Sequence, residues 1–410
     1  MLVYFSDCPF FAGCENMIPN FLNSNEINNI YDVYFIYRKS LEYEKELKNR
    51  LNSDLIKCFP IVLPEQHIHR TLLKRVKKIP LLYNILSAFI LFFWKYYSIA
   101  YSVIPLYLMF KKLDVNILHI NNGGYPGANT AYSAVFAARW KGVKKIIYVV
   151  NNIVEDYKSP FRWFDRIIDP YVRRSVTSFI TGSHNAGKAL AKVLKLPKYK
   201  VVNIANGVKI REVTLNKVEF LEELNIDIKG RLLFSTIALL EDRKGHIWLL
   251  KAIKKLKESN IDIDICPFFI FEGKGNNQET LKNYIIENNL EGYVKMIESI
   301  PTIFNLINAS DAIILPSISN EDFPNVIIEA MSLGKSAIGT RIAGIPEQID
   351  HGINGYVVNP SDADDLYHYL VKMINRDKIT SFSKESKAKF NANFTTTISV
   401  NKYLEIYKKN

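Results

Sequence analysis

The chain has 410 residues, of which 48% are apolar and 23% are charged. This length exceeds what one ordinary core needs, so we expect two or more domains, and the composition excludes a disordered chain. The formal net charge of +12 at pH 7 suits an anionic partner, but it does not choose among nucleotide phosphates, nucleic acid and an acidic membrane surface.

The start of the chain lacks the pattern of a secretory signal. Its apolar run, residues 1–5, meets Ser6 and Asp7 at once, without a basic lead or an apolar region of sufficient length. The four cysteines are sparse and have no CxxC spacing (Cys8, Cys14, Cys58 and Cys266). We therefore expect a reducing, cytosolic environment in which the cysteines are small hydrophobic residues.

Strand-like and helix-like segments alternate along the first half of the chain. The segments MLVYFS, IYDVYFIY, VNILHIN, KKIIYVV and SFITGS are typical of strands, and NTAYSAVFAARWKG between them is typical of a helix. This alternation predicts a parallel α/β domain over residues 1–205.

One segment of this domain breaks the alternation. The basic stretch HRTLLKRVKK, residues 69–78, precedes an apolar run, residues 79–110, whose single charge is Lys95. Residues 79–94 are shorter than the ~20 residues of a spanning helix, and Pro105 interrupts the rest. Core helices, a hairpin lying in a membrane interface and a transmembrane span are the three alternatives. The Tyr and Trp side chains of the run favour the interface, so we predict a peripheral membrane protein whose basic residues face anionic lipid.

The alternation starts again after Gly207. The segments RLLFSTIALL, CPFFIFEG, YVKMIES, DAIILPS and SAIGT are typical of strands, and GHIWLLKAIKKLKES is typical of a helix. We therefore predict a second α/β domain of similar build over residues 206–390. Residues 391–410 contain VNKYLEIYKK, an amphipathic helix that we expect to return to the first domain.

The stretch NEDFPNVIIEAMSLG predicts a helix that points its N-terminus out of the sheet. It follows the strand DAIILPS, Pro324 fits the first turn of a helix and Gly334 fits its end. Open α/β sheets bind ligands at the carboxyl ends of their strands. The backbone N–H groups of the first turn attract anions and sugar hydroxyls there (Phe323, Asn325 and Val326).

Glu329 occupies a position of this helix that an apolar residue would normally fill. A buried carboxylate is costly unless it gains hydrogen-bond donors. A ribose diol would supply two charge-assisted hydrogen bonds of roughly 1.5–3 kcal/mol each. The alternative is a structural role, in which Glu329 caps a neighbouring loop or pairs with a lysine.

Two further loops belong to the same predicted edge of the sheet. Arg243 and Lys244 follow the strand RLLFSTIALL, and cations at that place suit a diphosphate, although a solvated charged loop has the same pattern. Gly273 and Gly275 follow the strand CPFFIFEG without the third glycine of a dinucleotide fingerprint. We interpret these glycines as turn residues that also permit close approach of a ligand.

The motifs RKGH, FEGKG, the two glutamates Glu321 and Glu329 eight positions apart, GIPEQI and HGINGYVV occur in this order. Together they resemble the C-terminal domain of glycosyltransferase family 4, the retaining enzymes of GT-B fold, over roughly residues 206–407. The resemblance implies a GT-B fold of two Rossmann-like, doubly wound domains facing each other across a cleft. It further implies that Glu329 holds the ribose of a nucleotide-sugar and that Lys244 meets the diphosphate.

The resemblance assigns the remaining site residues as well. Glu321 lies near the transferred sugar, whose hydroxyls the backbone after it binds (Phe323, Pro324, Asn325 and Val326). Gly273 permits close approach of the donor. FFAGCENMIPNFL resembles the glycine-containing loop that opens the family, so Gly13 approaches the phosphates or the acceptor. Such enzymes need no metal, so the DxD pattern of Asp262 and Asp264 is interpreted as the alternation of a strand.

The chain departs from the family pattern at two places. Ala238 and Leu239 stand where the family often has Gly-Arg, and we expect Arg243 to replace the lost cation. Asn151 and Asn152 follow the strand after which the family commonly has a histidine near the sugar. The sequence therefore names no catalytic acid or base.

The predicted function is transfer of a sugar from an NDP-sugar, with UDP or GDP as the nucleotide, to a glycan or polyprenyl-linked acceptor with retention of configuration. The groups predicted to stabilise the leaving diphosphate are Lys244, Arg243 and the helix N-terminus. No cofactor, metal or nucleic acid is expected. The place of action is the cytoplasmic face of the cell membrane, in the assembly of surface polysaccharide or lipopolysaccharide. The alternative is a non-catalytic GT-B scaffold protein of a polysaccharide-assembly complex.

Overall fold

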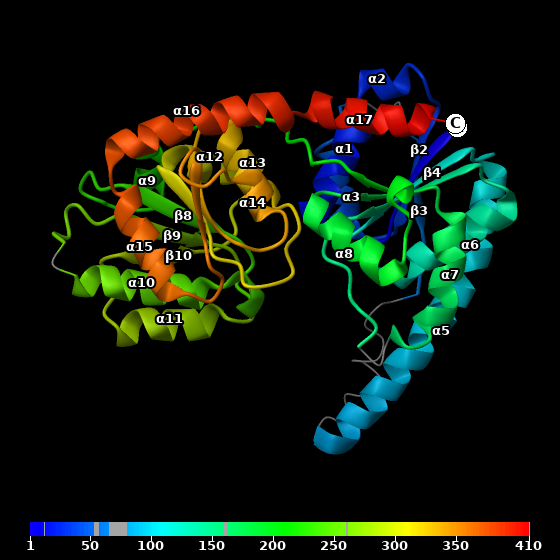
Figure 1. The fold of residues 1–410 in the computed structure, drawn as a ribbon, viewed down its shortest axis with the longest axis horizontal. Helices are drawn as coiled ribbons and strands as arrows, with labels where there is room; N and C mark the ends of the chain where they lie inside the picture. Colours follow the sequence, from blue (N-terminus) through cyan, green and yellow to red (C-terminus); the bar gives the residue numbers. More distant parts are fainter. Residues whose placement is uncertain (12, 53–56, 65–79, 159–161, 260, 410) are drawn as a thin grey trace. The chain divides into compact units, whose positions relative to one another are not determined.

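The computed structural model describes residues 1–11, 13–52, 57–64, 80–158, 162–259 and 261–409. They form two compact units (Figure 1). Unit 1 comprises Met1–Ile204 together with Val400–Asn410, and unit 2 comprises Ala205–Ser399. The basic stretch that was predicted to face lipid, residues 69–78, lies outside the described residues.

Unit 1 is built on a parallel sheet in the order β3-β2-β1-β4-β5-β6-β7. The chain builds β1, β2 and β3 toward one edge and then places β4 on the other side of β1. The strands are β1 (Leu2–Ser6), β2 (Val33–Arg38), β3 (Lys57–Ile61), β4 (Ile117–Asn122), β5 (Lys145–Val150), β6 (Ser178–Thr181) and β7 (Val201–Asn203). The strand order therefore reverses between β1 and β4, which is the topological switch point of a doubly wound sheet.

Helices cover both faces of this sheet, so its central strands are apolar on both sides. Val3 and Phe5 of β1 pack toward one set of helices, and Leu2 and Tyr4 pack toward the other. The first set is α5 (Pro80–Lys112), α6 (Asn129–Lys141), α7 (Asp165–Ser175) and α8 (His184–Leu194). The second set is α1 (Met17–Leu22), α2 (Asn25–Asn28), α3 (Leu41–Lys48) and the C-terminal helix α17 (Thr396–Lys408).

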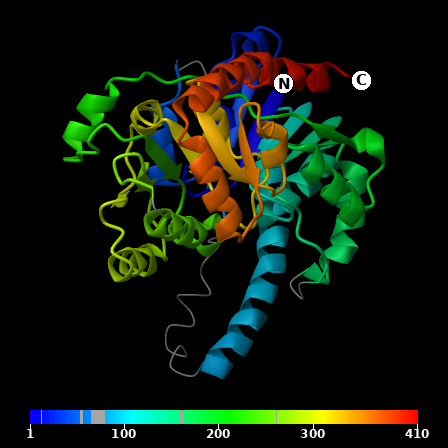
Figure 2. The ribbon, with the colours of Figure 1, turned by 60° about the vertical axis from the view of Figure 1, so that its left-hand side comes forward.

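Helix α5 continues through Pro105, so the prediction that this proline interrupts the segment is wrong. One side of its second half, including Val103 and Leu106, belongs to the core. Ser133 of α6 also donates a hydrogen bond to the carbonyl of Ile99 (2.8 Å). Packing along the helix therefore outweighs the one backbone hydrogen bond that the proline removes. The first half of α5 extends beyond the rest of unit 1 (Figures 1 and 2).

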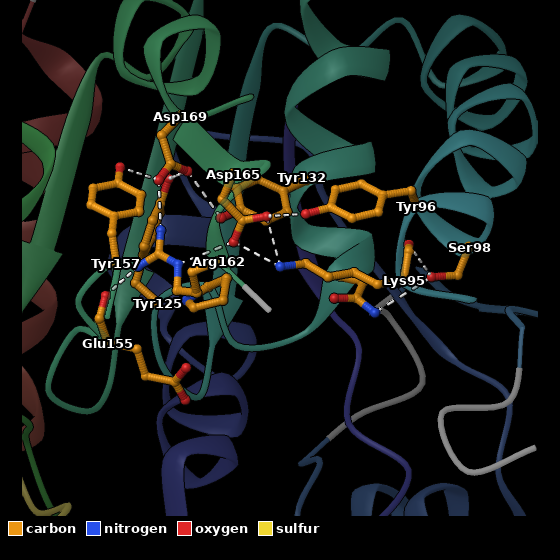
Figure 3. Close-up of polar contacts among 12 residues, drawn as sticks. Lys95, Tyr96, Ser98, Tyr125, Tyr132, Glu155, Tyr157, Arg162, Asp165 and Asp169 are labelled. Atoms are coloured by element: carbon orange, nitrogen blue, oxygen red, sulfur yellow. Dashed lines mark hydrogen bonds and ion pairs between the residues drawn. The ribbon is translucent and has the colours of Figure 1, made fainter. Parts of the chain in front are cut away.

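A buried network of charges fixes α5 to α7 (Figure 3). The Lys95 ammonium contacts both carboxylate oxygens of Asp165 at 2.7 Å. Arg162 joins Asp165 (Nε to Oδ2, 3.0 Å) to Asp169 (Nη2 to Oδ2, 2.6 Å). Three tyrosine hydroxyls also donate to Asp169 (Tyr125, Tyr132 and Tyr157). Because Arg162, Asp165 and Asp169 are almost completely buried, each charge depends on these partners.

The C-terminal helix α17 completes unit 1. Its apolar side chains pack on the face of the sheet that carries Leu2 and Tyr4 of β1. The Tyr407 hydroxyl lies 2.6 Å from Nδ1 of the buried His119 on β4. Lys145 of β5 donates to the carbonyl oxygens of Ile406 (3.2 Å) and Tyr407 (2.7 Å). A cation at the C-terminus of a helix compensates its free carbonyls and its dipole.

Unit 2 repeats the design with a parallel sheet in the order β10-β9-β8-β11-β12-β13. Its strands are β8 (Leu233–Ile237), β9 (Phe268–Glu272), β10 (Val294–Ile297), β11 (Ala312–Leu315), β12 (Ser336–Thr340) and β13 (Gly355–Val358). Its switch point lies between β8 and β11. The two sheets confirm the predicted α/β class with doubly wound parallel sheets.

The helices of unit 2 connect these strands. They are α9 (Lys217–Glu223), α10 (His246–Glu258), α11 (Gln278–Glu287), α12 (Ile303–Ala309), α13 (Asn325–Ser332), α14 (Ile345–Gln348), α15 (Ala363–Met373) and α16 (Arg376–Asn393). Asp262 and Asp264 precede β9 in a turn, where Asp262 accepts a hydrogen bond from the N–H of Asp264 (3.1 Å). Their interpretation as the alternation of a strand is therefore wrong.

Candidate donor site of unit 2

The predicted site residues of the second half gather at the switch point of unit 2. Arg243 and Lys244 lie in the loop after β8, and Glu321 lies in the loop after β11. Since all strands of the sheet are parallel, the carboxyl ends of β8 and β11 lie at one edge, where ligands of such folds bind.

Gly245 brings the two loops together. It follows the short 3-10 helix Asp242–Lys244, and its φ of +70° lies in the left-handed region. A Cβ atom at this position would lie 2.0 Å from the carbonyl oxygen of Pro316, at the start of the other loop. The N–H of Ile318 also donates to the carbonyl of Arg243 (2.8 Å). A residue with a side chain would push the loops apart, so glycine is required here.

This approach places the ammonium of Lys244 against Oε1 of Glu321. The same carboxylate oxygen accepts a hydrogen bond from the Ser317 hydroxyl (3.0 Å). The side chains of Lys244 and Glu321 are only 13% and 9% exposed. A pair this buried has lost most of its hydration, so each charge depends on its partner or on a ligand that replaces it.

Arg243 is turned toward the neighbouring backbone and a second acid. Its Nε lies 2.6 Å from Glu241, and its Nη1 donates to the carbonyl of Asn320 (3.2 Å). Its Nη1 also lies 3.9 Å from Oε1 of Glu321. Arg243 therefore braces the loop that carries Glu321. The structure places two cations beside one carboxylate, with Lys244 in direct contact and Arg243 at the outer limit of an ion pair.

The predicted helix begins directly after this loop. Pro324 is the N-cap of α13 and has no side-chain cap, so the sequence placed the helix start within one residue. The carbonyl of Pro324 accepts a hydrogen bond from Gln348 Nε2 (3.0 Å), and Asn325 Oδ1 accepts one from Asn206 (2.9 Å). Phe323 is buried and packs against Phe394, and Val326 follows in the first turn. The N-terminus of α13, which is the positive end of its dipole, thus follows Glu321 of the ion pair by a few residues.

Glu329 is the fifth residue of α13 and is 5% exposed. Ile328, Ala330 and Met331 around it are buried as well. Its side chain lies on a helix that starts at the switch-point edge, as predicted. Burial on this scale confirms that Glu329 occupies a core-like position and is no surface acid.

The packing of the fold requires glycine at positions 273 and 275, in addition to the predicted close approach of a ligand. A Cβ at Gly273 would lie 2.1 Å from the carbonyl oxygen of Ala238, and one at Gly275 would lie 2.3 Å from that of Leu240. The loops after β8 and β9 are also hydrogen bonded, from the N–H of Leu240 to the carbonyl of Lys274 (3.0 Å). The glycines therefore allow these two loops to pack directly on each other.

Sequence reasoning missed Ser317 at this edge, and it gave no role to His246 of the RKGH motif. Ser317 connects Glu321 to β12, because its carbonyl accepts a hydrogen bond from the Thr340 hydroxyl (2.6 Å). His246 begins α10 directly after Gly245, is 2% exposed, and has no hydrogen-bond partner on either ring nitrogen among the described residues. Burial lowers the pKa of His246 to about 4, and the nearby Lys244 adds to this effect. A single serine such as Ser317 gives no distinctive pattern in a sequence.

Gly13 belongs to unit 1, unlike the other predicted site residues. It begins the 3-10 helix Gly13–Asn16 that follows the loop after β1, and a Cβ would meet nothing within 4 Å. Within the described residues, no group of three or more His, Cys, Asp or Glu side chains is arranged to hold a metal ion.

Comparison with known proteins assigns most of unit 2 to a family. The model of the family described as glycosyl transferases group 1 matches residues 219–393. The UDP-Gal:alpha-D-GlcNAc-diphosphoundecaprenol alpha-1,3-galactosyltransferase of Escherichia coli is 25% identical over 316 residues, which are 75% of this chain and 78% of the relative. The second half of the chain therefore contains a domain of this family, and the chain is a glycosyltransferase.

Other comparisons agree with this assignment. The amylovoran biosynthesis glycosyltransferase AmsK of Erwinia amylovora is 23% identical over 231 residues, covering 54% of this chain and 56% of the relative. The solved structure of Anabaena Alr3699/HepE in complex with UDP-glucose superimposes with a TM-score of 0.74 and 16% identity, covering 99% of both chains. Such a likeness shows the fold, which is that of the GT-B glycosyltransferases.

The region that matches the group 1 family contains the whole switch-point site of this glycosyltransferase. Lys244, Arg243, Glu321 and Glu329 all lie between residues 219 and 393, whereas Gly13 lies outside. The arrangement offers a cation beside a displaceable carboxylate, a helix N-terminus and a second, buried carboxylate. These groups can meet a diphosphate, sugar hydroxyls and a diol.

Proposed function

We propose that this glycosyltransferase moves a sugar from a UDP-sugar to a lipid-linked glycan acceptor with retention of configuration, at the cytoplasmic face of a membrane, during surface-polysaccharide assembly. The observation that carries the proposal is the buried pair of Lys244 and Glu321 at the switch point of unit 2. The E. coli relative is named for a UDP-galactose donor and a diphosphoundecaprenol acceptor, which supports the donor and acceptor classes.

The ion pair prepares the site for the donor. In the ligand-free chain Glu321 neutralises Lys244, so no buried charge is left alone. When the donor binds, its diphosphate oxygens replace Glu321 beside the ammonium. The released carboxylate then accepts hydrogen bonds from hydroxyls of the sugar that is to be transferred. Arg243 and Ser317 keep the loop in place during this exchange.

The reaction exchanges one bond at the anomeric carbon for another. The bond between that carbon and the diphosphate oxygen breaks, and the acceptor hydroxyl oxygen bonds to the carbon on the same face. The hydroxyl proton leaves with the diphosphate. Lys244 and the N-terminus of α13 stabilise the negative charge that grows on the leaving oxygen, and this needs no protein nucleophile. Glu329 binds the ribose diol and thereby sets the position of the diphosphate.

Helix α5 supports the membrane part of the proposal. Its segment Phe89–Lys112 has the length and mean hydropathy of a membrane span, the one such helix among the described residues, and most of it is not buried in the fold. The exposed side chains follow one side of the helix at spacings of three and four residues: Phe89, Phe93, Tyr97, Tyr101, Ile104 and Leu108. Because the opposite side of the second half of α5 packs in the core of unit 1, we favour a helix that lies on the bilayer surface over one that crosses it.

Exposed apolar side chains also occur just before α7 and in its first turn. Phe164 packs against Phe92 of α5, with ring centroids 4.9 Å apart, and Trp163 and Ile167 beside it are more than half exposed. We call the exposed side chains of α5 together with Trp163, Phe164 and Ile167 the apolar surface of unit 1. A contiguous exposed patch of this kind marks a protein or membrane contact, and its aromatic rings favour the interface of a bilayer.

The test is a panel of UDP- and GDP-sugars. A bound donor raises the melting temperature by mass action, so a UDP-sugar is expected to stabilise the chain more than its GDP counterpart. Slow hydrolysis of the same donor shows that the site is catalytic, and the NMR coupling of the released sugar's anomeric proton, read before mutarotation, shows retention. Binding without hydrolysis or transfer, on any acceptor offered, would instead favour the non-catalytic scaffold.

A further inference from the structure

Unit 2 contains a cavity at the edge of its sheet where the strands begin. Its volume is about 390 Å³, within the range of small-molecule sites. The lining comes from β9, from β10 and from the loops that precede β8, β9 and β10. The candidate donor site lies after β8 and β11, at the opposite edge of the same parallel sheet. A ligand in this cavity would therefore not occupy the donor site.

The cavity is lined by Arg231, a buried cation without a counter-ion. Arg231 is 8% exposed, and no carboxylate of the described residues lies within ion-pair distance of it. Its Nε donates to the carbonyl of Ile228 (3.2 Å), and its Nη2 donates to that of Gly292 (3.0 Å). Its Nη1 has no hydrogen-bond partner among the residues that the structure describes. A buried charge is costly unless it is paired, so an anion in the cavity would supply the missing partner.

The guanidinium of Arg231 is held in one orientation. Its Cζ lies 5.2 Å from the ring centroid of Phe268, which is itself buried at the start of β9. The two backbone carbonyls fix the plane of the group from the loops before β8 and β10. This bracing accounts for Nε and Nη2 but leaves Nη1 unused. A donor fixed in this way is preformed for a ligand, which lowers the entropy cost of binding.

Two lysines add positive charge to the same cavity. The ammonium of Lys295 on β10 donates to the carbonyl of Leu224 (2.9 Å). Lys229 has a φ of +50°, and its N–H donates to Oδ1 of Asp227 (2.7 Å), which fixes the loop that carries it. Neither ammonium forms an ion pair with an acid within the described parts of the chain. Three cations around one cavity match a phosphate group, which accepts several charge-assisted hydrogen bonds.

The remaining charges of the lining are acids. Asp227, Asp264 and Glu291 line the cavity and are exposed, so they form its rim. Carboxylates only accept hydrogen bonds, and they repel a bare anion. Hydroxyl groups donate to carboxylates and carry no charge. A lining of three cations and three acids therefore fits a ligand that joins one phosphate to several hydroxyls.

We propose that this cavity binds a sugar phosphate. The phosphate contacts Nη1 of Arg231 and the ammonium groups of Lys229 and Lys295, and the sugar hydroxyls donate to the carboxylates of the rim. The site goes beyond the proposed function and does not depend on it. Because the cavity and the donor site lie at opposite edges of the sheet, the sugar phosphate and a UDP-sugar bind at the same time.

Calorimetry with glucose 6-phosphate, inorganic phosphate and glucose tests the site. Glucose 6-phosphate should bind, inorganic phosphate should bind roughly tenfold more weakly, and glucose should not bind. Arg231→Gln should weaken the binding of glucose 6-phosphate by roughly tenfold or more. Because Arg231 also braces two loops, Lys229→Glu is a second test at an exposed position and should weaken binding roughly threefold or more. The matched control is Lys282→Glu, the same change of charge at an exposed position of α11 outside the cavity.

Two further measurements test the rim and the separation from the donor site. Glu291→Gln should lower the preference for glucose 6-phosphate over inorganic phosphate, and an unchanged preference would overturn the contacts of the hydroxyls. Saturating UDP should leave the Kd of glucose 6-phosphate unchanged. Equal effects of Lys229→Glu and Lys282→Glu, a folded Arg231→Gln variant with the wild-type Kd, glucose that binds as tightly as its phosphate, or displacement by UDP would each overturn the proposal. A lack of UDP binding would count against the proposed function and leave the sugar-phosphate site standing.

Discussion

Lys244 and Glu321 form an ion pair although 77 positions separate them in the chain. The pair joins the loop after β8 to the loop after β11, which are the two loops of the switch point in unit 2. Its burial makes it costly unless both charges serve a purpose. Exchange of the carboxylate for a donor diphosphate supplies that purpose, and it makes the two residues act as one functional unit.

The first prediction concerns this coupling. Lys244→Met and Glu321→Gln should each lower kcat for sugar transfer by roughly 10²-fold, as loss of one transition-state charge does. The double variant should be little slower than either single variant, because each substitution already breaks the unit. The exposed pair Lys254 and Glu258 on α10 is the control, and its variants should keep wild-type rates. Additive losses in the site variants would show that the two residues act separately.

The second prediction concerns the buried carboxylate of α13. Glu329→Gln keeps the size of the side chain but removes its charge, so UDP should bind roughly 10- to 100-fold more weakly, since two hydrogen bonds to a charged group are weakened. Calorimetry with UDP and with its 2′,3′-dideoxy analogue measures the effect. Wild-type protein should prefer UDP strongly, and the variant should bind both alike. Retained preference in the variant would assign Glu329 a structural role. Glu279→Gln, an exposed position on α11, is the matched control.

Much of the donor site could be predicted because its residues are tied to local pattern. Pro324 marks the start of α13, and Gly334, with a φ of +66°, marks its end. Lys244 follows a strand, so parallel topology alone places it at the same edge as Glu321. The contact between these two residues could not be predicted. It depends on Gly245, whose close approach to Pro316 is a property of the folded backbone.

Unit 1 shows where sequence reasoning fails. Pro105 predicted a break, yet α5 continues because its neighbours hold it on both sides of the proline. The network around Arg162 left no pattern, since its members come from α5, α6, α7 and the segments that precede α6 and α7. Tertiary contacts of this kind have no periodicity that a single sequence reveals.

The third prediction tests the apolar surface of unit 1. Replacing Phe93, Tyr97 and Tyr101 of α5 by serine should shift the protein from sedimenting vesicles of anionic lipid to the supernatant, because the replaced side chains are more than half exposed and supply the apolar contact. Replacing three exposed isoleucines of unit 2 by serine is the control and should leave sedimentation unchanged (Ile263, Ile265 and Ile286). Equal sedimentation of all three proteins would remove the membrane role from α5.

The fourth prediction concerns the buried charges that join α5 to α7. Lys95→Met leaves the fully buried Asp165 with Arg162 and Tyr96 as its partners among the described residues, so the free energy of unfolding should fall by about 3 kcal/mol. Urea unfolding of the purified variant measures the loss. Lys95→Arg, which keeps the cation, should restore the stability in part.

A second substitution serves as the control for Lys95. Asp165→Asn, added to Lys95→Met, removes the uncompensated carboxylate and should recover part of the lost stability, while Arg162 stays paired with Asp169. A double variant that is no more stable than Lys95→Met would show that the uncompensated charge of Asp165 is not the source of the loss.

The fifth prediction concerns the pH dependence of stability. Burial lowers the pKa of His119 to about 3, because a protonated ring would place a cation among Tyr4, Phe21 and Tyr403, and its Nε2 has no partner among the described residues. In the unfolded chain this ring takes up its proton near pH 6.5. Between about pH 6.5 and 3 the unfolded state therefore binds one more proton, so the free energy of unfolding falls as the pH is lowered, by up to about 1.4 kcal/mol per pH unit.

His119→Gln removes this proton uptake while keeping a polar side chain opposite Tyr407. Urea unfolding from pH 7 to 4 should therefore show a flatter decline for the variant than for the wild-type chain. The difference between the two curves is the measured quantity, because contributions of other groups cancel in it, including those of Glu15 and Asp169, whose pKa values burial raises. His368→Gln, at an exposed position on α15, should keep the wild-type slope. The difference in the free energy of unfolding between the variant and the wild-type chain could instead be the same at every pH. That result would show that His119 takes up its proton equally in the folded and unfolded states, so that its burial does not keep the ring neutral.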